Sequence, residues 1–235
     1  MVTIAPRFNG PDHSGNGGYV AGLVAEALGR PGPVTSTLRL PPPLATPLAW
    51  EHGDDEVRLE THGGAVVGTA VPGEFSRAAP AFADTVEIAA GLAAYPGFHH
   101  HPFDHCFTCG TARAAGDGLR IFTGPTTPGR TAGSWSVHPD HADAGGAVGT
   151  PVAWAGLDCP GGWAADFTLQ PMVLGRMTAE VVRPPRAGEQ LHAAGELHVR
   201  DGRKFHTSTA LYTAAAELVG RAEQTWIEID LAQFG

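Results

Sequence analysis

The chain has 235 residues, a hydrophobic content of 43% and a charged content of 17%, which is typical of an ordered globular protein with a substantial core. Its formal net charge of −9 argues against nucleic acid or an anionic membrane as a partner, and no apolar run reaches the roughly 18 residues of a membrane span. Three cysteines give no even disulfide framework, and residues 1–3 do not resemble the start of a signal peptide. We therefore expect a cytoplasmic protein.

The first third of the chain predicts an apolar helix followed by an antiparallel meander. Residues 19–28 are apolar on nearly every helical face, and Gly29 and Pro31 end the helix. A helix of this kind needs to be wrapped, and a curled sheet is the expected partner. From residue 34 the hydrophobic period changes to two, which predicts strands over 34–40, 48–52, 56–62 and 65–71.

The rest of the chain predicts a second unit of the same kind. Residues 96–102, rich in Pro, Gly and His, predict a connection between the units. A second apolar helix is expected from Pro151, since a proline is tolerated in the first turn of a helix. Alternating segments predict strands over 118–123, 133–137, 177–183, 190–200, 204–215 and 218–229. We expect two domains, formed by residues 1–98 and 99–235.

Two segments of the chain resemble each other. Residues 36–45 align with residues 178–187, and a pair of prolines occupies the same place in both. Each segment follows an apolar helix and leads into a long strand and a hairpin turn containing Gly and Asp. This similarity predicts an internal duplication, and thus an α+β fold built from two similar units.

Asp158 is the unusual residue of the second helix, predicted over 151–164. No Lys or Arg lies within seven residues of it, and its neighbours are apolar. Pro160 and the two glycines after it predict that the helix kinks or stops there and leaves space beside the carboxylate. The alternative interpretation is an aspartate turned to solvent near a helix end. The matching place in the first helix holds Ala25.

Three motifs have counterparts in known proteins: residues 16–23 (NGGYVAGL), residues 106–110 (CFTCG) followed by 118–120 (GLR), and Asp158 with Gln224. The first resembles the Gly-Gly-Tyr helix start of the acyl-CoA thioesterase II group. The second resembles the Cys-Phe-x-Cys-Gly opening of many single-hotdog thioesterases. Asp158 and Gln224 fall where the thioesterase II group carries an Asp and a late-strand Gln. With its duplication, the chain thus resembles the double hotdog thioesterases.

This resemblance implies a fold of two tandem hotdog units, each an apolar helix wrapped by an antiparallel sheet. It implies hydrolysis of an acyl thioester, with acyl-CoA or an acyl-carrier protein as substrate, no cofactor, and a homo-oligomer, specifically a dimer. The chain departs from the group where its catalytic Thr would fall, near Leu174. Two alternatives are a non-catalytic acyl-thioester binding protein and a hotdog enoyl-thioester hydratase. The hydratase would pair an Asp with a His, and we find no His at the matching place.

The chemistry of thioester hydrolysis assigns roles to five residues. Negative charge that develops on the carbonyl oxygen is stabilised by backbone N–H groups at a helix start, which Gly17 and Gly18 supply without a side chain in the way. Asn16 caps that helix or orients the carbonyl. Asp158 is the candidate base or nucleophile, and Gln224 the residue that positions water. Because the two halves of a double hotdog face each other, we expect these residues to form one site.

Two other chemistries involve the cysteines. Cys106 and Cys109 have partial zinc-ligand spacing with nearby histidines, but no second Cys-x-x-Cys completes a closed site. We expect both to be reduced and metal-free. Cys159 adjoins Asp158 and could act as a nucleophile, although no His lies near it in sequence and a free buried cysteine usually serves packing. The histidines of the possible zinc cluster are His99, His100, His101 and His105.

Overall fold

The first apolar segment forms helix α1 (Gly17–Leu28), as its composition predicts. The computed structural model describes residues 1–234 of the chain. Asn16 caps α1 by accepting a hydrogen bond from the Tyr19 N–H at 2.8 Å, and Gly29 ends it in the left-handed conformation. The strands of this half are β1 (Val2–Thr3), β2 (Val34–Leu38), β3 (Pro47–His52), β4 (Val57–Thr61) and β5 (Val66–Pro72). The four strands predicted by alternation are confirmed.

The second half contributes the other six strands. They are β6 (Gly124–Thr127), β7 (Arg130–Ser136), β8 (Met172–Val181), β9 (Gln190–Asp201), β10 (Lys204–Tyr212) and β11 (Leu218–Glu228). The strand predicted over 118–123 is wrong. The N–H groups of Leu119 and Ile121 donate instead to the carbonyls of Phe107 and Thr108. This segment therefore runs as a loop along residues 106–110, the cysteine motif. The alternating pattern there reflects burial against that motif.

The eleven strands of residues 1–234 belong to one sheet with the order β1-β3-β4-β5-β2-β8-β11-β10-β9-β7-β6. The halves join at β2 and β8, which pair antiparallel with Thr35 opposite Thr178 and their hydroxyl oxygens 2.7 Å apart. Each of these strands is the first after its unit's central helix, as a duplication predicts. The junction hides two strand edges that would otherwise be open to pairing with other chains. The predicted α+β fold of two hotdog units is confirmed.

The second apolar helix is broken in two. Helix α3 (Thr150–Gly156) ends before Asp158, and helix α4 (Cys159–Ala164) begins directly after it. The kink or stop predicted at residues 160–162 occurs a few residues earlier, at Leu157 and Asp158. A proline removes the bond to the carbonyl four residues back and clashes with it, so the break falls after Gly156 while Pro160 sits in the first turn of α4.

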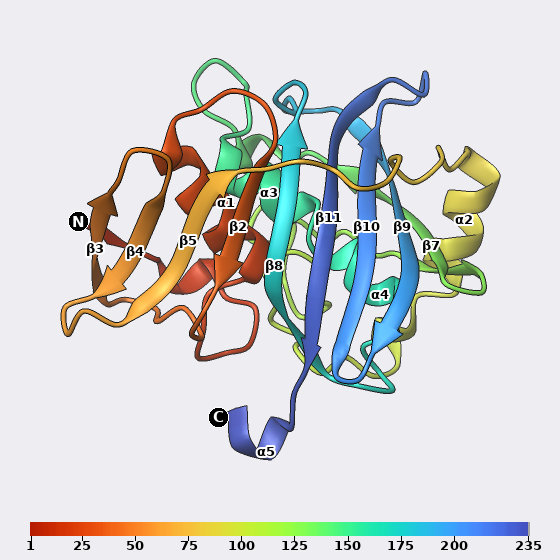
Figure 1. Cartoon of the computed structure of the whole chain (residues 1–235). Helices are drawn as coiled ribbons and strands as arrows, with labels where there is room; N and C mark the ends of the chain where they lie inside the picture. Colours follow the sequence, from red (N-terminus) through yellow and green to blue (C-terminus); the bar gives the residue numbers. More distant parts are fainter. Residues whose placement is uncertain (235) are drawn as a thin grey trace.

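The central helices all lie against the concave face of the sheet (Figure 1). Helices α1 and α3 pack closely because a glycine without a side chain lies at their contact. A Cβ on Gly22 would lie only 2.6 Å from the Cβ of Trp154. Helix α4 packs against β9, β7 and β10. None of the helices described here is both long and apolar enough to cross a membrane.

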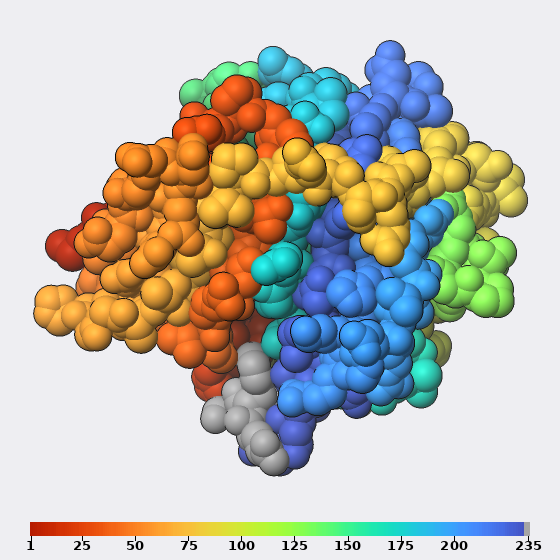
Figure 2. Space-filling view, viewed as in Figure 1, coloured from red at the N-terminus to blue at the C-terminus, as the bar shows by residue number. Residues whose placement is uncertain are grey.

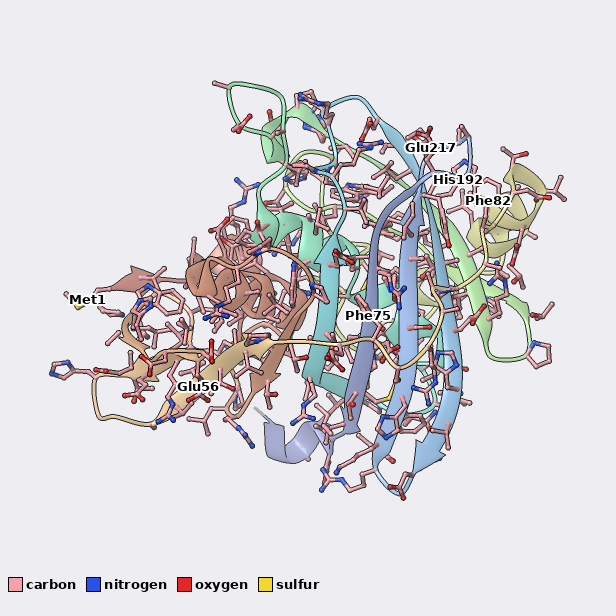
Figure 3. All side chains as sticks on the ribbon, turned by 45° about the horizontal axis from the view of Figure 1, so that its top comes forward. Met1, Glu56, Phe75, Phe82, His192 and Glu217 are labelled. Carbon is pink, nitrogen blue, oxygen red and sulfur yellow. The ribbon has the colours of Figure 1, made fainter. Side chains whose placement is uncertain are left out.

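Residues 73–84 cross the outer face of the sheet as an extended strap (Figures 1 and 2). The Phe75 ring packs against the Arg221 guanidinium at 3.7 Å, and the Phe82 ring stacks on His192 with centroids 5.1 Å apart (Figure 3). Glu223 on β11 accepts bonds from the Ser76 and Arg77 N–H groups at 2.9 and 2.6 Å. Strand alternation thus turns Glu223 outward and the next residue inward.

The strap leads to helix α2 (Thr85–Ala93), which packs on β7 and β6 at the far edge of the sheet. This helix falls within the predicted unit of residues 1–98, yet it packs on strands of the predicted unit of residues 99–235. The domain boundary at that point stays a prediction. The remaining elements are the short helix α5 (Leu231–Phe234) and 3₁₀ turns η1 (Pro6–Phe8), η2 (Pro96–Phe98) and η3 (Pro139–His141).

Candidate active site

Asp158 lies at the break between α3 and α4 and is only 2% exposed. One carboxylate oxygen, Oδ2, accepts hydrogen bonds from the Gly18 N–H at 2.9 Å and from the Asn16 side-chain amide at 3.1 Å. The other oxygen, Oδ1, has no partner in the part of the chain that the structure describes. The start of α1 therefore fixes the carboxyl group through one oxygen and leaves the second one buried without a hydrogen-bond partner.

The pKa of Asp158 is raised to about 8, chiefly because the side chain is buried and also because of the nearby Cys106 sulfur. The hydrogen bonds from Gly18 and Asn16 act in the opposite direction, because they favour the ionised form. A carboxyl group with this pKa exchanges a proton near neutral pH, as a general acid or base must. The alternative of a solvent-facing aspartate is wrong, since the side chain is enclosed.

A cavity of about 210 Å³ opens beside Asp158. Both halves of the chain line it, mostly with apolar side chains that include Leu38, Leu40, Phe103, Phe167, Leu174 and Trp226. Gly17 also borders it at the start of α1, where N–H groups have no intrahelical acceptor, and no acceptor for the Gly17 N–H is found within residues 1–234. An apolar chain can thus enter the cavity with a carbonyl group near both the Gly17 N–H and Asp158.

Gln224 lies behind Asp158, away from the cavity. Its amide nitrogen donates to the carbonyls of Leu157 and Asp158 at 2.6 and 2.8 Å, the groups released where the helix breaks. Its amide oxygen accepts from the hydroxyl groups of Thr207 and Thr209 on β10 at 2.9 and 3.3 Å. This set of bonds holds the helix break in place, so Gln224 positions the Asp158 backbone rather than the cavity contents.

Cys106, Cys109 and Cys159 form a buried group on the cavity wall, with their sulfur atoms within 4.8 Å of one another. Hydrogen bonds from the Cys109 and Cys159 thiols hold the pKa of Cys106 well below its usual range, whereas burial raises the pKa of both donors. Three thiolates suit a soft metal ion such as Zn²⁺. Within the described residues, no fourth His, Cys, Asp or Glu atom joins this group.

The possible zinc cluster of the cysteine motif is not assembled. His99 and His100 are exposed, and the ring of His105 lies 3.1 Å from the Asp12 carboxylate. The His101 ring contacts the carbonyl oxygen of Cys109 at 3.1 Å instead of a sulfur atom. The fold instead brings Cys159 next to Cys106 and Cys109. This proximity could not be predicted, because about 50 residues separate Cys159 from the other two in the sequence.

Similarity to known proteins is detectable only at the level of three-dimensional structure. No protein-family model matches the chain, and no curated protein sequence matches it. A candidate thioesterase from Novosphingobium aromaticivorans superposes with a TM-score of 0.60 at 17% identity, over 97% of this chain and 94% of its own. The tesB protein of Mycobacterium avium subspecies paratuberculosis gives 0.59 at 15% identity, over 94% and 89%. A candidate thioesterase II from Thermobifida fusca gives 0.57 at 15% identity, over 97% and 91%.

The chain is a double hotdog protein. Alignment over nearly the whole length of these structures matches both helix-and-sheet units at once. At these identities the likeness establishes the fold. The expected resemblance to double hotdog thioesterases is therefore confirmed at that level, and the chemistry of the cavity has to be argued from its own residues.

In this double hotdog protein the structure brings together Asn16, Gly18 and Asp158 by direct hydrogen bonds, and it places Gly17 on the same cavity. Sequence analysis did not single out Thr207 and Thr209, which orient Gln224. Their positions two apart on a predicted strand place both on the face toward the helices, and this was the available signal. The juxtaposition of Cys106 and Cys159 had no signal in sequence.

Proposed function

We propose that this double hotdog protein hydrolyses an acyl thioester of coenzyme A or of an acyl-carrier protein, with Asp158 as the general base. The observation that carries the proposal is the Asp158 carboxyl group, fixed through Oδ2, free at Oδ1 and placed on an apolar cavity. The thioesterase names of its structural neighbours support the same reaction class. No cofactor is part of the proposal.

In the proposed reaction the acyl chain occupies the cavity and the thioester carbonyl accepts a hydrogen bond from the Gly17 N–H. Asp158 takes a proton from a water molecule through Oδ1 while the water oxygen attacks the carbonyl carbon. The tetrahedral intermediate then collapses, the carbon–sulfur bond breaks, and the proton returns from Asp158 to the departing thiolate. Asn16 and the Gly18 N–H keep the carboxyl group in place throughout.

The proposal extends to location and assembly. We place the protein in the cytoplasm, because its cysteines are unpaired and thioesters of coenzyme A and carrier proteins are cytoplasmic substrates. The homodimer is proposed from the resemblance to the double hotdog thioesterases alone. Light scattering coupled to size exclusion measures the assembly directly. A mass of one chain at micromolar concentration contradicts the dimer and leaves the hydrolysis unaffected.

A non-catalytic acyl-thioester binding protein is the second candidate function. Leu174 favours it, since this apolar side chain stands near the place of the Thr expected from the thioesterase II group. It also packs against the helix start: a Cβ on Gly17 would lie 2.6 Å from the Cβ of Leu174. The same cavity then holds the acyl chain without turnover.

Thiol release from acyl-CoA of several chain lengths separates the two functions. We expect turnover by the wild type and a loss of at least about a hundredfold in Asp158→Asn, the scale of losing a general base. The volume is unchanged, so the fold should persist. Asp54→Asn, which alters an exposed turn, is the matched control. Undiminished turnover in Asp158→Asn contradicts the role of Asp158, and binding without hydrolysis by the wild type supports the second candidate.

A further inference from the structure

The Cys106 thiol shares a hydrogen-bond donor with the Asp158 carboxyl group. The side-chain nitrogen of Asn16 lies 3.1 Å from Asp158 Oδ2 and 3.6 Å from Cys106 Sγ. Both side chains border the apolar cavity, together with the Gly17 N–H. A carbonyl group placed for attack by a water molecule on Asp158 therefore also lies next to the Cys106 thiol. The hydrolysis described above does not use this thiol.

The surroundings of Cys106 favour a nucleophile over a packing residue. Its sulfur lies 3.8 Å from that of Cys159, and Cys109 completes the group within 4.8 Å. Two thiols and one amide thus surround a single sulfur atom as possible donors, an arrangement that stabilises a thiolate. The lowered pKa of Cys106 agrees with this geometry.

We propose that Cys106 accepts the acyl group from the incoming thioester, so that hydrolysis passes through an acyl thioester on Cys106. The inference rests on the proposed acyl-thioester chemistry of the same cavity. It adds a covalent intermediate to a reaction for which the Asp158 carboxyl group alone is otherwise sufficient.

The two half-reactions balance. In the first, the Cys106 thiolate attacks the carbonyl carbon, the bond to the departing sulfur breaks, and the protonated Asp158 gives its proton to that sulfur. In the second, the ionised Asp158 takes a proton from water, whose oxygen attacks the acyl-Cys106 carbon. The carbon–sulfur bond breaks, the carboxylic acid leaves, and the Cys106 thiolate and the protonated Asp158 are restored. No oxidant or reductant is required.

The proposal assigns two tasks to one carboxyl group, and a single variant can separate them. Asp158→Asn cannot take a proton from water, so the second half-reaction stops. The first half-reaction still proceeds in this variant, because the thiolate of coenzyme A leaves without full protonation. Asp158→Asn should therefore accumulate the acyl-enzyme that the wild type turns over.

The test mixes wild type and Asp158→Asn with butyryl-CoA and octanoyl-CoA, quenches with acid, and measures intact and peptide masses. We expect up to one acyl group per chain in Asp158→Asn, mapped to Cys106, and a burst of thiol release of the same stoichiometry. Cys106→Ala should lose the adduct and at least about a hundredfold of turnover, the scale of one catalytic group. Cys109→Ala should still form the adduct at Cys106. Thermal melting confirms that each variant is folded.

Three results overturn the proposal: turnover by the wild type with no adduct or burst in Asp158→Asn, wild-type turnover by Cys106→Ala, or stoichiometric zinc in protein purified without added metal. Zinc would occupy the sulfur atoms that the reaction needs. An adduct at Cys106 without turnover by the wild type upholds this inference and contradicts hydrolysis. Turnover by the wild type without an adduct in Asp158→Asn contradicts this inference and leaves the proposed hydrolysis standing.

Discussion

Helices α1 and α3 pack against each other, yet the two ends of their contact differ. Gly18 lies against Asp158, just beyond the end of α3, and Gly22 lies against Trp154 and Pro151 near its start. At the first end, the Gly18 N–H donates to the Asp158 carboxylate at 2.9 Å. At the second end, Pro151 has no N–H to give, and Ala25, which takes the place of Asp158 in α1, has no side-chain group to receive one.

Space does not distinguish the two ends. The second end has a cavity of about 310 Å³, which Ala25 and Trp154 help to line, against about 210 Å³ at the first. Its other walls carry the charged side chains of Glu26, Arg30 and Glu180. A duplicated fold thus supplies two hollows, and the pairing of a helix-start N–H with a buried acid makes only one of them a candidate for chemistry.

The largest effect is expected from closing the gap between the helices at the first end. A Cβ on Gly18 would lie 2.5 Å from the Cβ of Asp158 and 2.8 Å from the Trp154 carbonyl oxygen. Gly18→Ala should therefore lower the free energy of unfolding by about 1–3 kcal/mol and displace the carboxyl group. Turnover should fall at least a hundredfold, on the scale of a lost base. Gly53→Ala, whose Cβ meets only an ordinary contact at 3.5 Å, is the control. Equal behaviour of both variants contradicts the comparison.

Gly17→Ala tests the carbonyl-binding N–H of the first end. The added methyl would overlap Leu174 and shift the helix start away from the carbonyl oxygen. We expect a rise in the barrier on the order of 3 kcal/mol, the value of one oxyanion donor, measured as kcat/KM for acyl-CoA. In a Leu174→Gly background, which also removes the Leu174 Cβ, the space exists, so adding Gly17→Ala should have little further effect. If kcat/KM falls equally in both backgrounds, the loss does not come from the clash between the added methyl and Leu174.

An attempt to build a second site tests the other end. Ala25→Asp places a carboxyl group at a position only 5% exposed, at the end of the helix pair where Pro151 has no N–H to donate. We expect destabilisation by about 1–3 kcal/mol in urea unfolding, the value of an unpaired buried polar group. Combined with Asp158→Asn it should restore no turnover. Ala25→Asn separates charge from size. Recovery of hydrolysis in the double variant would show that a carboxyl group at position 25 can act as the base without a hydrogen bond from a helix-start N–H group.

The smallest effect concerns the pH dependence that only the first end should show. Because the pKa of Asp158 is about 8 and a base must be ionised, kcat should rise with pH and level off above that value. Stability has the opposite sign. A raised folded-state pKa gives a contribution that is complete below the ordinary value of 3.8 and is lost as the pH rises toward 8.

Asp158→Asn removes this loss, so the variant should gain stability relative to wild type as the pH rises from 4 to 8. Urea unfolding of both proteins across that range measures the difference. Parallel profiles would mean that the carboxyl group has an ordinary pKa in the folded protein.

Much of the fold follows from local patterns. The period of two from residue 34 and the apolar segment 19–28 were sufficient for the meander and its helix, because both patterns are properties of neighbouring residues. The strand expected over 118–123 failed since alternation there arises from burial against the cysteine motif. The helix break was misplaced, because the effect of Pro160 acts four residues back, on Gly156.

The sequence by itself determined the two apolar helices, their sheets and the singular acid Asp158, because these depend on residues close together in the chain. Only the tertiary structure decided that Asn16 and Gly18 meet Asp158, some 140 positions away, since this contact needs the pairing of β2 with β8 and the close approach of α1 to α3. It also decided the raised pKa of Asp158 and the meeting of Cys106 with Cys159. Burial and through-space contact set these properties, and neither leaves a local pattern in the sequence.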